Sequence, residues 1–390
     1  MNERTKSYIR SRFREYYQNA TLKMPPELDK REWGFIFFDR SYPDITMRRH
    51  KYFASEASII SYLREMAPAH TYYSSALYTY PGASSMNAKE WLGADLIFDL
   101  DADHLRRKAD SYSGMLEMVK KETLKLIDFL IADFGFGADD MEIVFSGGRG
   151  YHVHITDPRV RSLGSGERRE IIDYLRGTGL DYDRFLIEES VKGETGRRTK
   201  SLKISHDGGW GKKIHESVID LLEMISGMEK EDVFEELAGM GITDKKEARK
   251  IIKLSNKEMK EEIKRGFVGF KGFPRGFWEN LIDVLKLDIG GESDEPVTSD
   301  IKRLIRFPTS IHGGSSLQVT PLKMDQMDDF DPLSDAVIFG DDSTSVKVTK
   351  PCEIFIRGEN FKLSEGEETL PEYAAVFLMC RGMGEFGPRK

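Results

Sequence analysis

Cysteine is scarce in this sequence, whose 390 residues include two, Cys352 and Cys380. So small a number excludes a disulfide framework and a cysteine-rich zinc site, and we expect both cysteines to be small buried side chains. The sequence also lacks an apolar signal segment at its start and any apolar run of about 18 residues. These absences indicate neither secretion nor membrane spanning, so we expect an intracellular, cytoplasmic protein.

An excess of positive charge is also absent. Lysine and arginine together number 58, against 66 aspartates and glutamates, which gives a net charge of −8. This balance excludes a globally basic nucleic-acid binder, so any contact with nucleic acid must come from a local groove. The length suggests about two domains, and the 39% of hydrophobic residues is enough to form a core.

One stretch, Gly93 to His104, begins as an apolar run and ends in carboxylates. Residues 96–98 predict a buried strand. Residues two apart on a strand share a face, so Asp99 and Asp101 should point the same way while Leu100 points into the core. Adjacent carboxylates repel each other, and a divalent cation such as Mg²⁺ or Mn²⁺ resolves the conflict. The alternative is a solvated strand end that runs into an acidic turn.

A glycine-rich loop at residues 146–150 joins two predicted strands into a hairpin. Its glycines let the backbone approach a ligand closely, and successive N–H groups can form an anion-binding nest. Ser146 adds a hydroxyl group, and Arg149 adds a guanidinium group that matches phosphate oxygens. The spacing is not that of a Walker A loop, and the alternative is an ordinary tight hairpin.

Two histidines, His152 and His154, follow the loop and share one face of the second strand. Beside the serine and arginine of the loop, they favour an anion-binding site over a plain hairpin. They could also ligate zinc, but a zinc site needs at least three protein ligands, and no other cysteine or histidine lies close in sequence.

A third segment, Asp294 to Gly313, leads from a carboxylate through a basic strand to a histidine, His312. Arg303 and Arg306 lie on that strand and could face a triphosphate. The alternative is an exposed amphipathic strand that ends in a turn.

The pattern along the chain predicts an α/β fold of the α+β kind, built on a mixed sheet. From about residue 207 the periodicity turns helical, which indicates a small inserted helical domain at 207–280. The insert would interrupt an α/β domain formed by residues 1–206 and 281–390. We expect its sheet to carry the strand of Asp99, the glycine-rich hairpin and the strand of Arg306 close together.

Together these segments resemble the small catalytic subunit of archaeal and eukaryotic DNA primase. The resemblance is carried, in the family's order, by residues 98–103 (FDLDAD), 146–152 (SGGRGYH) and 294–312. It extends to shorter stretches at residues 72–76, 91–95 and 209–213. It implies a primase-polymerase catalytic domain that synthesises short primers on single-stranded DNA at the replication fork.

The resemblance also implies site residues and partners. The family's metal-binding aspartates fall on Asp99, Asp101 and Asp294, which would hold two Mg²⁺ or Mn²⁺ ions for nucleotidyl transfer. Its nucleotide-phosphate residues fall on Ser146, Arg149, His152, Arg306 and His312, with Arg303 as a weaker match and Arg48 as a loose match to an upstream arginine. The implied partners are NTPs or dNTPs, a single-stranded DNA template and a primase large subunit.

One departure from the family pattern concerns zinc. Family members usually carry a knuckle of cysteine and histidine ligands soon after the aspartate strand, whereas residues 105–125 here contain neither residue type. We therefore expect no structural zinc, and any handling of the primer by that knuckle must be done another way.

Three other functions fit parts of the pattern. A metal-dependent phosphodiesterase or nuclease would use the aspartates with His152 and His154, and would cut strands without added nucleotide. A repair polymerase of the same superfamily would extend existing primers. A non-catalytic RNA- or DNA-binding subunit would need no metal, but such binders rely on broad basic surfaces, and the net charge argues against one.

Overall fold

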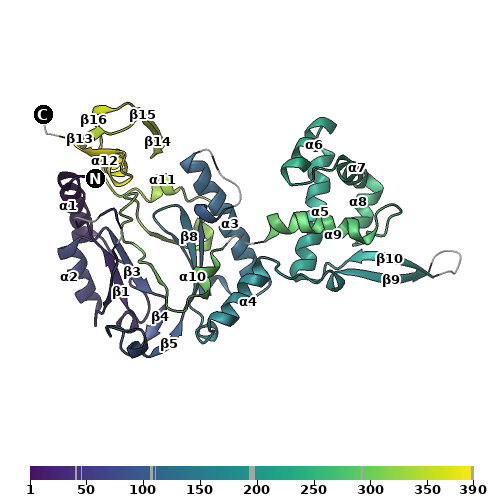
Figure 1. Cartoon of the computed structure of the whole chain (residues 1–390), viewed down its shortest axis with the longest axis horizontal. Coiled ribbons are helices and arrows are strands. Elements are labelled where there is room, and N and C mark those ends of the chain that lie inside the picture. Colours follow the sequence, from purple (N-terminus) through teal and green to yellow (C-terminus); the bar gives the residue numbers. More distant parts are fainter. Residues whose placement is uncertain are drawn as a thin grey trace. The chain divides into compact units, whose positions relative to one another are not determined.

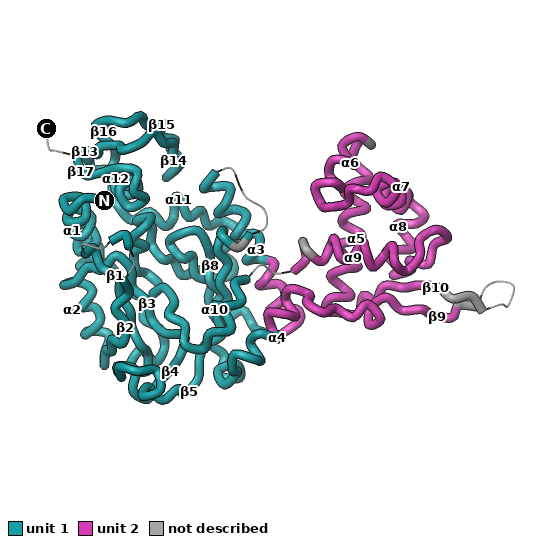
Figure 2. The backbone as a smooth tube through the Cα atoms, viewed as in Figure 1, with its two compact units in different colours: residues 1–124, 136–170, 292–390 teal, residues 125–135, 171–291 magenta. Residues whose placement is uncertain are grey.

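The structure is a computed structural model, and it describes residues 1–39, 42–44, 46–105, 109, 111–192, 198–290 and 293–387. The chain forms two units (Figure 2): unit 1 comprises residues 1–124, 136–170 and 292–390, and unit 2 comprises residues 125–135 and 171–291. Both units contain helices and strands, which confirms the mixed α/β class.

The helices of unit 1 are α1 (Glu3–Asn19), α2 (Glu56–Met66), α10 (Glu295–Ser299), α11 (Pro332–Asp335) and α12 (Glu372–Cys380). Helices α3 (Tyr112–Ala132) and α4 (Ser165–Leu175) begin in unit 1 and end in unit 2. The strands of unit 1 are β1 (Trp33–Ile36), β2 (Arg48–Lys51), β3 (His70–Ser74), β4 (Ala76–Tyr78), β5 (Trp91–Ala94), β6 (Leu96–Asp101), β7 (Met141–Phe145), β8 (Gly150–Ile155), β11 (Leu304–Arg306), β12 (Thr320–Leu322), β13 (Ser343–Val348), β14 (Cys352–Ile356), β15 (Glu359–Leu363), β16 (Gly366–Pro371) and β17 (Gly384–Phe386).

The first sheet of unit 1 has the strand order β12-β7-β8-β6, and all its neighbouring strands are antiparallel. Its strand β8 is labelled in Figure 1. Along β6, residues 96–98 and Leu100 are buried, whereas Asp99 and Asp101 are partly exposed. This alternation confirms that the two carboxylates share a face while Leu100 points into the core. The strand is at the edge of its sheet, and the carbonyl of Asp99 accepts the backbone N–H of Asp294 at 2.8 Å.

The second sheet has the order β11-β3-β1-β2, and Arg306 on β11 pairs with Tyr72 on β3. The prediction that the strand of Arg306 shares a sheet with Asp99 was therefore wrong. The two apolar residues of β11, Leu304 and Ile305, are both buried, and as neighbours on a strand they point to opposite faces. So short a hydrophobic pattern carries no information about the partner strand.

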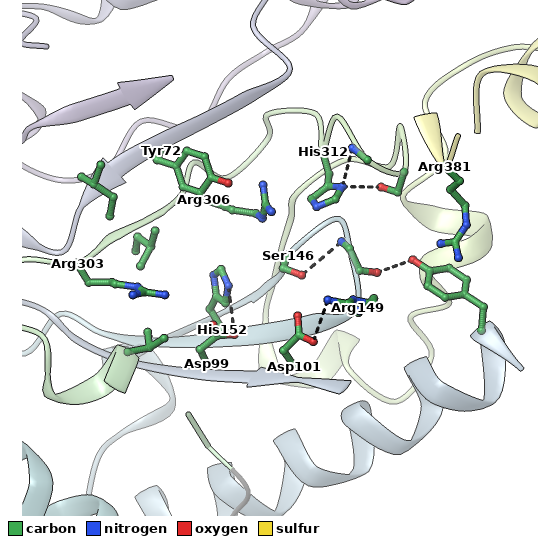
Figure 3. A pocket seen from close by; sticks show the side chains of 17 residues that line it. Tyr72, Asp99, Asp101, Ser146, Arg149, His152, Arg303, Arg306, His312 and Arg381 are labelled. Carbon is green, nitrogen blue, oxygen red and sulfur yellow. Dashed lines mark hydrogen bonds and ion pairs between the residues drawn. The ribbon is translucent and has the colours of Figure 1, made fainter. Parts of the chain in front are cut away.

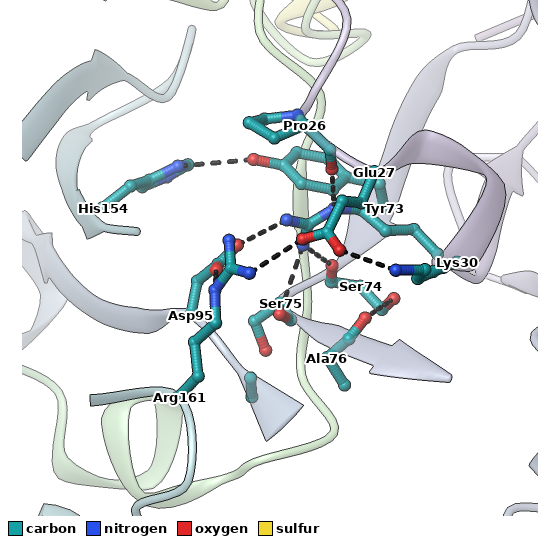
Figure 4. A network of polar contacts seen from close by, with 12 residues as sticks. Pro26, Glu27, Lys30, Tyr73, Ser74, Ser75, Ala76, Asp95, His154 and Arg161 are labelled. Atoms are coloured by element: carbon teal, nitrogen blue, oxygen red, sulfur yellow. Dashed lines mark hydrogen bonds and ion pairs between the residues drawn. The ribbon is translucent and has the colours of Figure 1, made fainter. Parts of the chain in front are cut away.

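A buried polar network joins the two sheets (Figure 4). Arg31, just before β1, pairs with Asp95, just before β6, at 2.6 Å, and both side chains are almost completely buried. Arg161 approaches the other carboxylate oxygen of Asp95 at 3.4 Å. Removing one partner of a buried ion pair leaves an uncompensated charge and typically costs about 3–5 kcal/mol. The network therefore fixes the start of β6 against the second sheet.

Helices cover the sheets with their apolar faces. In α1, Ile9, Phe13 and Tyr17 recur every four residues and are fully buried, as expected of an amphipathic helix. Helix α12 is buried at all nine positions, and its single acidic residue, Glu372, pairs with Arg12 at 2.6 Å. Among the described residues, no helix has both the length and the apolar character needed to cross a membrane.

Unit 2 contains the strands β9 (Leu186–Lys192) and β10 (Arg198–Ile204), which pair as an antiparallel hairpin. Its helices are α5 (Gly209–Ser226), α6 (Lys230–Gly239), α7 (Lys245–Leu254), α8 (Lys257–Lys264) and α9 (Arg275–Ile289). Helix α5 buries Ile214, Val218 and Leu222, which lie four residues apart on one face. Residues 207–280, suggested by the sequence as a helical insert, lie inside this unit.

Candidate active site

A pocket of about 460 Å³ lies in unit 1 between the face of the first sheet that carries the aspartates and the strand β11 (Figure 3). Its lining combines carboxylates, guanidinium groups, imidazoles and backbone of the glycine-rich loop. The lining residues are Tyr72, Asp99, Asp101, Tyr112, Ser146, Gly148, Arg149, His152, Val297, Arg303, Leu304, Ile305, Arg306, His312, Gly314, Ser315 and Arg381.

The acidic side of the pocket is built by β6. Burial raises the pKa of Asp99, and the nearby carboxylates of Asp101 and Asp294 raise it further. Asp294 caps the start of α10 and does not line the pocket, although its charge is close enough to act on Asp99. The three predicted metal ligands therefore lie near one end of β6, where the charges of Asp101 and Asp294 act on Asp99.

The glycine-rich loop turns tightly between β7 and β8, and two of its glycines are sterically required. Gly147 has φ of +73°, and a Cβ atom there would lie 2.7 Å from the Cβ of His312. A Cβ on Gly150 would lie 2.1 Å from the carbonyl oxygen of Leu100, because Gly150 pairs with Asp101 on β6. The loop can therefore lie against both β6 and the segment of His312 only with glycine at these positions.

Arg149, at the tip of the loop, is held by acidic neighbours. Its guanidinium group donates two hydrogen bonds to the carboxylate of Asp103, one of them at 2.7 Å, and lies 3.8 Å from Asp101. Both members of the Asp103 pair are about half exposed. A phosphate group that entered the pocket could therefore reach Arg149 without breaking a buried contact.

His152 faces the aspartates from the neighbouring strand. It pairs with Asp99 in the sheet register, and its Nε2 lies 3.5 Å from the Asp99 carboxylate. Burial lowers the pKa of His152 against the opposing effect of Asp99. The neutral ring then has one N–H group to donate, which suits binding of a phosphate or sugar oxygen.

The basic side of the pocket comes from the second sheet and the segment after it. Arg306 donates a hydrogen bond to Nδ1 of His70 at 2.7 Å, and its guanidinium lies 5.1 Å from the centre of the Tyr72 ring. His312 accepts the backbone N–H of Gly314 through Nδ1 at 3.2 Å. Burial and nearby Arg306 hold the pKa of His312 well below its usual range, so its proton is on Nε2 and the ring is neutral.

The structure brings together eight of the ten residues that the sequence suggested. The eight that line the pocket are Asp99, Asp101, Ser146, Arg149, His152, Arg303, Arg306 and His312. Asp294 lies beside the pocket, as described above. Arg48 lies on the edge strand β2, pairs with Asp39 at 3.2 Å and packs on the ring of Phe37, so it does not line the pocket.

Sequence reasoning missed four polar residues that line the pocket, Tyr72, Tyr112, Ser315 and Arg381. The hydroxyl of Tyr112 donates to the carbonyl of Gly148 at 2.5 Å, and Arg381 lies 4.3 Å from the centre of the Tyr112 ring. Tyr72 lies in a stretch that contributed to the family resemblance, which was a usable signal. Tyr112 begins a helix and Arg381 follows one, and neither position has a local pattern that indicates a site.

Within the described residues, no three His, Cys, Asp or Glu side chains converge closely enough to form a metal site by themselves. The donor chemistry nevertheless suits a hard divalent cation, because the groups present are carboxylate oxygens whose repulsion a cation would relieve. Mg²⁺ is usually bound by one or two carboxylates together with the phosphates of a substrate, so a complete protein cage is not required.

Comparison with known proteins shows the family. A family model described as DNA primase small subunit matches residues 98–324, which include β6, the glycine-rich loop and the segment of Arg306 and His312. This chain belongs to the DNA primase small subunit family. The DNA primase small subunit PriS of Methanococcoides burtonii is 45% identical to it, and that of Methanocella arvoryzae 46%, each over the full length of both chains. The PriS of Haloarcula marismortui is 39% identical over 99% of this chain and all of its own length. The family suggested by the sequence motifs is thereby confirmed.

Proposed function

We propose that this chain is the catalytic subunit of a DNA primase and synthesises short primers on single-stranded DNA. The observation that carries this proposal is the pocket itself, in which the paired carboxylates Asp99 and Asp101 face Arg303 and Arg306. Such a site can hold a nucleoside triphosphate by its phosphates while the carboxylates lie at the reacting end. The family shown by the comparisons supports the same activity.

The acidic residues of the pocket would bind metal ions, and its basic and neutral polar residues would bind the nucleotide. Asp99 and Asp101, assisted by Asp294, would hold Mg²⁺ or Mn²⁺, which when bound lowers the pKa of a hydroxyl group and neutralises phosphate charge. Whether one ion or two bind, the raised pKa of Asp99 supports this assignment, because a cation would stabilise the ionised form.

The remaining residues bind and orient the nucleotide. The 3′-hydroxyl oxygen of one nucleotide bonds to the α-phosphorus of the next, the bond to pyrophosphate breaks, and the hydroxyl proton passes to water. Arg149, Arg306 and the N–H groups of the glycine-rich loop would meet the charge on the phosphoryl oxygens. Burial lowers the pKa of His152 and of His312 and so weakens both rings as bases, so they would donate hydrogen bonds to phosphate or sugar oxygens rather than take up a proton.

The partners follow from the activity. The substrates would be NTPs or dNTPs and a single-stranded DNA template. The relatives are named small subunits, which supports a larger primase subunit as the protein partner of this chain. A site of action at the replication fork, inside the cell, follows from the same activity.

The test is primer synthesis on unprimed single-stranded DNA with all nucleotides and either Mg²⁺ or Mn²⁺. The native chain is compared with Asp101→Asn, which removes one carboxylate charge from the pocket, and with Asp139→Asn, a matched change at an exposed residue that does not line it. We expect short products from the native chain and from Asp139→Asn, and none from Asp101→Asn.

Other results would favour other functions. Products that form only when a primer is supplied would indicate an extending polymerase, or a primase that cannot begin without its large subunit. Adding the purified large subunit separates these two cases, because only the primase would then start new chains. Cleaved template without any synthesis would replace the proposal with a phosphodiesterase.

A further inference from the structure

Helix α7 in unit 2 has an unusual charge for this protein. Its ten residues, 245–254, include five lysines and arginines and one glutamate, in a chain whose net charge is −8. None of these residues lines the catalytic pocket, whose lining residues all belong to unit 1.

The cations of α7 occupy one side of the helix. Its buried residues are Ala248, Ile251 and Leu254, which pack toward the core of unit 2. The residues of α7 that are exposed are Lys245, Lys246, Arg249 and Lys253, and all four are cationic. An ordinary solvated helix face mixes lysine with glutamate, whereas this face carries one sign of charge.

This arrangement does not serve the stability of the helix. Lys245 and Lys246 lie in the first turn, where the helix dipole disfavours positive charge. Lys245 and Arg249, and again Arg249 and Lys253, are like-charged pairs four residues apart, which repel. None of the four exposed cations forms an ion pair with a described residue, and the one aromatic contact among them leaves Lys253 Nζ 5.9 Å from the centre of the Phe273 ring. Their charge is therefore available to an external anion.

We propose that the exposed face of α7 binds the phosphate backbone of nucleic acid. Lys245, Arg249 and Lys253 follow one another at about 6 Å along the helix axis, given a rise of 1.5 Å per residue. This makes a straight row of charges suited to a chain of phosphates. The face presents no exposed aromatic residue, so it would contact the backbone without stacking on bases, and binding would not depend on sequence.

An acidic protein is the other class of polyanion that a cationic face could bind. Protein interfaces, however, have an apolar or aromatic centre and are depleted in lysine. The exposed face of α7 has no such centre. The choice of single-stranded DNA as the probe rests on the proposed function, whose template is this molecule, and α7 would hold template outside the catalytic pocket.

The test uses the full chain and two triple variants of equal composition. The first is Lys245→Gln, Arg249→Gln and Lys253→Gln on α7. The control is Lys212→Gln, Lys264→Gln and Arg265→Gln, which removes the same charges from cations of unit 2 that are paired with glutamates at 3.8, 2.9 and 3.2 Å. Glutamine has nearly the helix propensity of lysine and arginine, so both variants keep their helices, which circular dichroism would check.

Binding of a fluorescein-labelled 30-nucleotide oligo(dT) is measured by anisotropy over a range of salt concentrations, without nucleotide and with EDTA. For single strands, the slope of log K against log salt changes by about 0.7 for each phosphate contact. We expect the α7 variant to bind at least roughly tenfold more weakly and to have a slope shallower by about 2. The control variant should match the native chain.

Three other outcomes would overturn the inference. An unchanged slope in the α7 variant would place the phosphate contacts elsewhere. Equal losses of DNA affinity in both variants would mean that the loss comes from the change in net charge and not from the position of α7. A native chain that does not bind DNA at low salt would favour an acidic protein as the partner of this face. A native chain that binds through α7 but makes no primers would leave the inference standing while the proposed function fails.

Discussion

His70 accepts a hydrogen bond from the guanidinium group of Arg306, with 2.7 Å between Nδ1 and the arginine nitrogen. The same Nδ1 accepts the backbone N–H of Gly313 at 3.3 Å. His70 is buried and does not line the pocket, whereas Arg306 does. His70 is therefore a positioning residue, which fixes the direction of the Arg306 guanidinium and the backbone just after His312.

Replacing His70 by leucine should weaken nucleotide binding. The change removes the only acceptor that the structure gives for this Arg306 nitrogen among described residues, and a hydrogen bond to a charged group contributes about 1.5–3 kcal/mol. We expect KM for the nucleotide to rise roughly tenfold to a hundredfold with little change in kcat. His70→Asn is the control, because its Oδ1 can replace Nδ1 as acceptor and should restore much of the affinity. Equal defects in both variants at equal stability would contradict a positioning role.

Breaking the ion pair between Arg149 and Asp103 should strengthen nucleotide binding, in contrast to the replacement of His70. Both groups are about half exposed, so the pair contributes no more than about 1 kcal/mol, and a bound phosphate must compete with it. Asp103→Asn should therefore tighten nucleotide binding by up to about fivefold, whereas Arg149→Ala should weaken it strongly and leave the fold intact. Titration with nucleotide measures both, with Asp139→Asn as the control. Weaker binding by Asp103→Asn would mean that Asp103 holds Arg149 in its productive position.

Tyr112 supports the glycine-rich loop by donating its hydroxyl to the carbonyl of Gly148. Tyr112→Phe deletes that hydrogen bond and keeps the ring on which Arg381 packs. A neutral hydrogen bond contributes about 1 kcal/mol, so we expect KM for the nucleotide to rise about fivefold. Tyr174→Phe, which also removes a single hydrogen bond but lies in unit 2, should leave KM unchanged. A fall in kcat alone would show that the loop acts on the reaction rather than on nucleotide binding.

The sequence could predict those parts of this site that are determined by residues near one another in the chain. The alternation around Asp99 and Asp101 indicates which way the carboxylates point, and the glycines at 147 and 150 indicate a loop that only glycine permits. The alternation and the tight turn depend on neighbours a few residues away, so a short pattern contains them. The contacts with His312 and Leu100 that require glycine at these two positions are long-range, and the pattern does not contain them.

The remaining parts depend on contacts between distant segments. Arg306 reaches the pocket from a second sheet, and His70 meets it across 236 residues of sequence. Arg381 follows directly after α12, a helix whose residues are all buried. The sequence pattern there indicates burial but gives no sign that the next side chain lines the pocket. Arg48 shows the converse: its loose motif suggested a nucleotide contact, but register places it on the far edge of the second sheet.

Buried histidines should make the stability of the fold depend on pH. Burial holds the pKa of His154 well below its usual range, and the ring is fully enclosed, with Nδ1 3.4 Å from the hydroxyl of Tyr73. The unfolded chain therefore takes up a proton on this histidine at about pH 6.5, whereas the folded chain does not. The free energy of unfolding thus has its full value above that pH and falls as the pH decreases below it. Between pH 6.5 and 5.5 this single group should remove about 1 kcal/mol.

The histidine effect is measured by urea denaturation at several pH values, in the native chain and in His154→Gln. The variant cannot take up a proton, so its stability should fall by about 1 kcal/mol less over the same interval, whatever its stability at pH 7. The control is His206→Gln, an exposed position, which should keep the native slope. Parallel slopes for the native chain and His154→Gln would mean that the folded state protonates His154 as readily as the unfolded state does. The packing of β8 against Tyr73 would then have to open in mild acid, because Nε2 of His154 is buried without a hydrogen-bond partner among the residues that the structure describes, and a charged imidazole would need an acceptor there.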